Sequence, residues 1–256
     1  MDNLFLIIST GIFLLGFVLA MQSLRKGRQG EVRLNLWLAI IGLIFQSLFL
    51  KIRGEMHGRC PITNGAEVLV FISWSIVILY LALGRPFRLS LLGVFSMPLI
   101  FLFQLAAIVW LALADPGPRP PDQLDPWLEL HAAMSLLAYG AFGLTGIAGI
   151  MYLLQDRQLK SRAPGRLFYS LPPIRFLVDA IARLLAIGVA LLTIGIVAAF
   201  FMEVRPDLLH LGASGAVWVI YIALLVVCFG RKVAPKRLAL FSIVAFGFAL
   251  LTLSVL

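Results

Sequence analysis

Three histidines, His57, His131 and His210, are the residues of this chain best suited to chemistry. An imidazole binds a metal such as iron through one ring nitrogen while the other nitrogen donates to a neighbouring acceptor. His131 stands at the head of an almost wholly apolar run, where we expect a membrane helix to begin. From the residues alone, two interpretations of His131 remain open: a metal ligand, or an interfacial histidine bonded to a loop.

The other two histidines carry weaker signals. His57 precedes Cys60 by three residues, a spacing compatible with a metal pair, although a closed zinc site needs four ligands. His210 follows Arg205-Pro206-Asp207, and both histidines also read as ordinary loop residues. Nothing in the chain resembles an activated nucleophile or a general acid–base pair, so we expect no catalysis by the chain in isolation.

The composition indicates the elements that must position these side chains. The chain is 61% hydrophobic and 13% charged, with a mean hydropathy of +1.02, which excludes a soluble domain. Its 256 residues leave room for about eight spans of roughly 20 residues each. The sequence therefore predicts an all-α integral membrane protein in which residues 1–256 form a single domain in the lipid bilayer.

Charged and proline-rich breaks separate the apolar runs. We predict membrane helices at 4–24, 34–53, 66–84, 88–113, 128–154, 176–202, 212–230 and 236–255. The net charge of +9 is explained by orientation in the membrane rather than by nucleic-acid binding, because cytoplasmic loops concentrate Lys and Arg.

Charge counts along alternate loops predict the orientation. The loops after the first, third, fifth and seventh helices, with their flanks, hold 16 of the 21 basic residues, whereas nine of the twelve acidic residues lie on the opposite side. The positive-inside rule then places both termini outside the cytoplasm. The outer loops run over 54–65, 114–127 and 203–211, which puts all three histidines at the extracytoplasmic face.

Two further features bear on a ligand site. The fifth predicted helix carries Gly140, Gly143, Gly146 and Gly149, which favour close helix packing, with a groove for a flat ligand as the alternative. Of the five tryptophans, Trp74 and Trp218 lie deeper than an interfacial belt requires, and both are candidates to line a pocket.

Several segments resemble the cytochrome c assembly protein family. Residues 61–74, P-I-T-N-G-A-E-V-L-V-F-I-S-W, are similar to the P-L-S-N-x-x-E-x-L-x-F-x-S-W stretch of its CcsA branch. The segment from His131 to Tyr139 resembles that branch's H-x-x-x-x-L-x-x-Y pattern, and residues 175–200 with the last helix pair resemble the shorter HemX and YpjD relatives.

The resemblance implies haem handling in the inner membrane of a bacterium, beside a partner membrane subunit of cytochrome c maturation. His131 matches an external haem-ligating histidine, with His210 or His57 as the opposite ligand. Among its departures from the larger members, residues 203–210 contain none of the tryptophans of their WWD segment. It would thus act as one subunit of a haem-lyase system rather than as a complete enzyme.

Two other functions remain open. A HemX-like regulator or scaffold of haem biosynthesis would use the basic loop 156–166 and Arg175, Asp179 and Arg183, which stand four residues apart. A small-molecule permease suits the number of spans, but few ionisable residues stand inside them.

Overall fold

The computed structural model describes residues 2–26, 32–84, 90–113, 125–160, 171–203, 208–230 and 233–253. Eight helices in these ranges are long and apolar enough to cross a membrane. They are α1 (Asp2–Lys26), α2 (Val32–His57), α3 (Gly65–Gly84), α4 (Ser90–Leu113), α5 (Pro126–Lys160), α7 (Ile174–Ala199), α8 (Leu208–Phe229) and α9 (Pro235–Thr252). The prediction of an eight-span, all-helical membrane protein is confirmed.

The helix ends differ from the prediction at two places that matter for the histidines. We expected α2 to end at residue 53, but it continues to His57, where the exposed Lys51 and Glu55 form an i,i+4 ion pair on its surface. We expected the seventh membrane helix to begin at residue 212, but this helix, α8, already begins at Leu208. His57 and His210 therefore lie in terminal helical turns rather than in loops.

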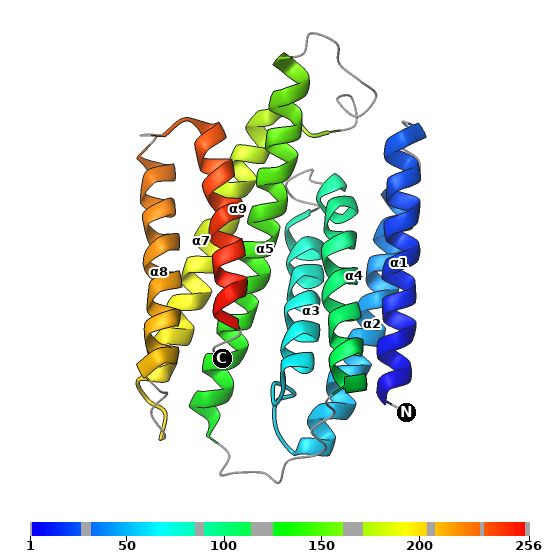
Figure 1. Cartoon of the computed structure of the whole chain (residues 1–256), viewed down its shortest axis with the longest axis vertical. Coiled ribbons are helices and arrows are strands. Elements are labelled where there is room, and N and C mark those ends of the chain that lie inside the picture. The colour runs from blue at the N-terminus through cyan, green and yellow to red at the C-terminus, as the bar shows by residue number, and fades with distance from the viewer. Residues whose placement is uncertain are drawn as a thin grey trace. The chain divides into compact units, whose positions relative to one another are not determined.

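The chain divides into two compact units, residues 1–124 and 125–256. In unit 1, α1 packs against α2 and α4, and α3 packs against α4 and α2 (Figure 1). Polar side chains link these helices inside the apolar core: the Gln104 amide donates to Ser9 Oγ (3.1 Å), and Ser9 Oγ donates to the carbonyl oxygen of Gly42 (3.2 Å).

In unit 2, the central helix is α5, a 35-residue helix that packs extensively against α7 and α9. Figure 1 shows α9 lying along α5, and α8 beside α7. The Phe142 ring of α5 stacks on Tyr221 of α8 with centroids 3.4 Å apart, and Gly188 of α7 leaves the space that Phe142 occupies. The large apolar side chains thus fill the core where small residues make room.

The glycine row of α5 serves helix packing. A Cβ atom added at Gly149 would lie 2.8 Å from the carbonyl oxygen of Ala239, and one at Gly146 would touch Phe246, both on α9. At these two positions the face is covered by α9, so the alternative of a groove for a flat ligand is wrong there.

Several predictions fall outside the described residues. The loops 114–127 and 156–166 are described only from residue 125 and up to residue 160, and residues 204–207 of the loop 203–211 lie outside the described ranges. The placement of both termini outside the cytoplasm, and the joining of residues 1–256 in one domain, stay predictions.

Candidate functional site

His131 lies on the second turn of α5 and is buried against α7. Its Nδ1 atom is 2.8 Å from the carbonyl oxygen of Gly195. Because a carbonyl oxygen only accepts, Nδ1 carries the proton in this bond, and in the neutral ring the lone pair is on Nε2. A backbone carbonyl that fixes the tautomer in this way is the usual outer partner of a metal-binding histidine.

His210, in the first turn of α8, faces His131. The two Nε2 atoms are 3.4 Å apart, and the ring centroids are 5.7 Å apart with the planes inclined by 47°. In the neutral pair, His210 Nε2–H donates a long hydrogen bond to His131 Nε2. The structure therefore brings together two of the three predicted histidines, with their Nε2 atoms directed at each other.

The backbone around His131 is held by close contact and by a helix cap. A Cβ atom at Gly195 would lie 2.7 Å from Ser135 Oγ and 3.2 Å from the His131 carbonyl oxygen, so only glycine lets α7 come this near. Asp125 precedes α5, and its carboxylate accepts from the Trp127 N–H (2.9 Å) and the Glu203 N–H (2.9 Å).

Asp125 thus ties the start of α5 to the segment after α7. The bond from the Glu203 N–H, followed by those from the first turn of α5, lowers the pKa of this carboxyl below its ordinary value. Beside it, the Trp127 and Phe201 rings are in contact, with centroids 4.9 Å apart. These contacts fasten the start of α5, the helix that carries His131, to the segment that follows α7.

His57 belongs to unit 1 and has partners of its own. Its Nε2 atom lies 3.1 Å from Glu67 Oε1, and both side chains are fully buried. Arg53 Nε is 4.0 Å from the same carboxylate oxygen, and Arg53 Nη2 donates to Asn3 Oδ1 of α1 (3.5 Å). A buried carboxylate is tolerated only with such partners.

The P-I-T-N-x-x-E motif builds this cluster. Asn64 Oδ1 caps α3 by accepting from the Glu67 N–H (3.0 Å), while Glu67 Oε2 accepts from the Thr63 N–H and hydroxyl (both 2.8 Å). This arrangement is similar to a capping box, except that the Glu67 carboxylate accepts from Thr63, the residue before the cap, rather than from the cap itself. Glu67 and Arg53 were missed as partners of His57, although Glu67 is a motif residue; no sequence signal pointed to Arg53.

Trp74 is half-buried in unit 1. Its indole Nε1–H donates to Ser47 Oγ of α2 (2.9 Å), and its ring contacts Phe71 at a centroid distance of 5.2 Å. The bond satisfies a polar group that the membrane cannot satisfy.

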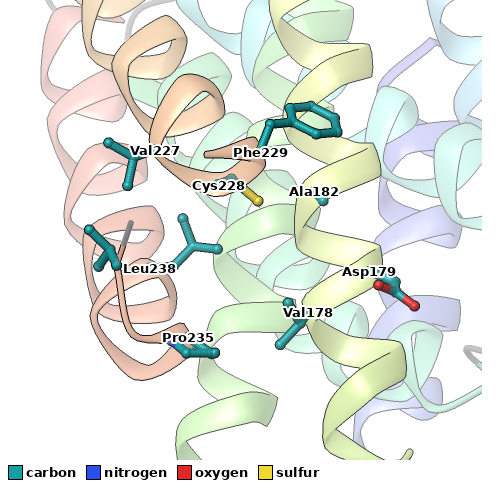
Figure 2. Close-up of a pocket in the computed structure, with 9 residues that line it drawn as sticks. Val178, Asp179, Ala182, Val227, Cys228, Phe229, Pro235 and Leu238 are labelled. Atoms are coloured by element: carbon teal, nitrogen blue, oxygen red, sulfur yellow. The ribbon is translucent and has the colours of Figure 1, made fainter. Parts of the chain in front are cut away.

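Unit 2 also contains a cavity of about 550 Å³ between the ends of α7, α8 and α9 (Figure 2). Its lining is mostly apolar, with one thiol and one carboxylate: Val178, Asp179, Ala182, Val227, Cys228, Phe229, Val233, Pro235 and Leu238. The sequence offered no signal for it, because apolar residues of three separate helices line it.

Comparison with known proteins decides the family. Residues 62–204 match the family described as Cytochrome C assembly protein. The chain belongs to the cytochrome c assembly protein family. The family resemblance predicted from the motifs is confirmed.

Two relatives of this chain are called Protein HemX. The chain is 31% identical to that of Brevibacillus brevis over 69% of this chain and 63% of the relative. It is 28% identical to that of Bacillus subtilis over 64% and 60%. Cytochrome c biogenesis protein CcsA of Trieres chinensis is 27% identical over 45% of this chain and 38% of the relative. The match thus spans about three fifths or less of these relatives' length.

The family match includes only part of the two histidine clusters. It covers Glu67, His131 and Gly195, whereas His57 and His210 lie outside residues 62–204. His131 with its carbonyl partner is therefore the part of the candidate site that lies within the family match.

Proposed function

We propose that the chain binds haem at the extracytoplasmic face of a bacterial cytoplasmic membrane and presents or relays it in cytochrome c maturation, together with a partner membrane subunit. The observation that carries this proposal is the facing pair His131 and His210, with the Nδ1–H of His131 held by Gly195. Membership of the cytochrome c assembly family and the name of the CcsA relatives support the assignment to cytochrome c maturation.

The donor set fits haem. When bound, haem supplies an iron whose axial positions accept imidazole nitrogens. The observed 3.4 Å between the two Nε2 atoms is that of two hydrogen-bonded rings, so His210 would have to move away from His131 to let haem enter between them.

The surroundings assign unequal roles to the two rings. His131 is buried and bonded to Gly195, and we propose it as the ligand of fixed orientation. His210 is half-buried in the first turn of α8, so it is the ring that moves aside. His57 and Trp74, also predicted to bind the cofactor, have the partners in unit 1 described above, which favour structural roles for both.

An absorption spectrum of the purified protein tests the proposal. We expect a Soret band with added haem, its loss in His131→Ala, and a changed spin state in His210→Ala. His57→Gln, which retains a donor toward Glu67, is the matched control and should leave the band unchanged. A protein that binds no haem, or a spectrum indifferent to both His131→Ala and His210→Ala, would exclude the proposal.

The second candidate function is a HemX-like regulator or scaffold, favoured by the two Protein HemX relatives with 31% and 28% identity. It requires the charged residues Arg175, Asp179 and Arg183 rather than the histidines. Pull-downs compare variants of these charged residues with variants of the histidines. A regulator or scaffold should lose its partner when the charged residues are changed and keep it when the histidines are changed.

A further inference from the structure

The rings of His131 and His210 meet head-on. Their centroids are 5.7 Å apart and their Nε2 atoms are 3.4 Å apart, a difference of 2.3 Å. This difference equals the two distances from ring centre to ring nitrogen taken together, so both Nε2 atoms lie on the line that joins the ring centres. The lone pair of an imidazole nitrogen points outward along the same line. Two unprotonated Nε2 atoms in this arrangement direct their lone pairs at one point.

Both rings can offer that lone pair while they stay neutral. In His131 the proton is already on Nδ1, where the Gly195 carbonyl oxygen holds it. In the closed pair His210 carries its proton on Nε2, and its ring is half-buried. When an ion enters between the rings, the His210 proton passes from Nε2 to Nδ1 through water, so each ring remains a neutral ligand.

The number of ligands selects the kind of ion. Among the residues that the structure describes, no group of three or more His, Cys, Asp or Glu side chains could hold a metal ion. A closed zinc site needs four ligands, and copper(II) favours a square-planar set. Copper(I) carries a single charge, binds imidazole and is stable with two donors in line. No cysteine lies beside the pair, because Cys228 stands at the other end of α8 and Cys60 lies in unit 1.

We propose that the closed His131–His210 pair of the haem-free protein binds one copper(I) ion, in line between the two Nε2 atoms. A single ion needs no room beside this line, whereas a porphyrin extends around it and requires His210 to move away. Copper(I) and haem therefore compete for the same nitrogens, and the bound ion keeps α5 and α8 together. This inference rests on the geometry of the pair and goes beyond the proposed haem function.

Competition with a coloured chelator measures the binding. Cys60→Ser and Cys228→Ser are introduced first, because thiolates bind copper(I) strongly and the chain has no other cysteines. The haem-free protein is then titrated, without oxygen, into the copper(I) complex of bicinchoninate, and the loss of colour counts the ions transferred. We expect one ion per chain.

Variants of the two ligands locate the ion. Loss of an outer partner alone weakens metal binding about 10–100-fold, so His131→Ala and His210→Ala should each cost at least about 100-fold. His210→Ala leaves the contact between α5 and α7 intact, and it decides the test if His131→Ala does not fold. His57→Gln, in the buried cluster with Glu67, should bind copper(I) like the parent chain.

Two further measurements identify the ligand set. X-ray absorption at the copper edge should show two nitrogen neighbours and no sulfur. Silver(I), which has the same charge and the same preference for two donors in line, should displace copper(I), whereas zinc(II) at the same concentration should not.

A chain that takes no copper(I) from bicinchoninate, or takes it equally after His210→Ala, would overturn the proposal. A sulfur neighbour, or displacement by zinc(II), would overturn the two-histidine site. Copper(I) binding without a Soret band on addition of haem would leave this inference intact and exclude the haem function, and a Soret band without copper(I) binding would do the opposite. Where both bind, saturating copper(I) should block haem uptake until bicinchoninate removes the ion, and undiminished uptake would contradict a shared site.

Discussion

The imidazole of His131 donates from Nδ1 to the carbonyl oxygen of Gly195, 2.8 Å away, across the contact between α5 and α7. The bond exists because Gly195 has no side chain: its Cα faces Ser135 and the backbone of His131. The orientation of the candidate ligand on one helix is thus governed by a glycine on another.

Gly195→Ala should therefore damage the site without touching either histidine. The added methyl group meets Ser135 Oγ, forces α7 from α5 and costs about 1–3 kcal/mol of stability. Ser135→Ala in the same chain should restore part of the loss, because it removes the nearest contact. Thermal unfolding and the haem spectrum of the single and double variants measure both effects, and additive losses would contradict this account.

Glu67 should be the most sensitive residue of unit 1. Glu67→Gln removes the charge that Arg53 and His57 share in a buried cluster, at a cost of about 3–5 kcal/mol. The control is Glu55→Gln, which removes an exposed carboxylate paired with Lys51 at 3.6 Å and should cost less than about 1 kcal/mol. Similar unfolding temperatures for the two variants would refute the structural role of the cluster.

Asp125 predicts a pH dependence. Its pKa is lowered in the folded protein, so its contribution is present above the ordinary aspartate pKa of about 3.9 and is lost as the pH falls through the lowered value. Asp125→Asn should thus reduce the unfolding temperature at pH 6, and the difference from the native chain should shrink well below pH 4. A difference that stays constant over this range would show that the carboxylate charge has no part in it.

The two cysteines test the predicted orientation. Charge asymmetry places Cys60 at the extracytoplasmic face and Cys228 at the cytoplasmic face. In intact cells, a membrane-impermeant maleimide should label the single-cysteine variant that keeps Cys60, and should label Cys228 only after permeabilisation. The reverse labelling pattern would show that the orientation in the membrane is inverted and that the histidine pair lies at the cytoplasmic face.

The spans were predictable because each is a long apolar run, a signal that depends on local sequence alone. The end of α2 and the start of α8 were not predictable to the residue. At the end of α2, Lys51, Glu55 and His57 look like loop residues, although the Lys51–Glu55 pair suits a helix surface. Pairing across helices was beyond local patterns: His131 was predicted as a ligand, but its bond to Gly195 links residues 64 positions apart. Glu67 was recognised as a residue of the motif, but its pairing with Arg53 was found only in the structure.

The length of α5 has a consequence for access from water. Its 35 residues measure about 52 Å, whereas the hydrocarbon layer is about 30 Å thick. An α5 helix perpendicular to the membrane therefore has some four turns outside the hydrocarbon at its two ends together, and the polar stretch from Gln155 to Lys160, with its Asp156–Lys160 ion pair of 2.8 Å, supplies fewer than two of them. A soluble protein, an antibody fragment or a protease can contact these turns from water without entering the bilayer.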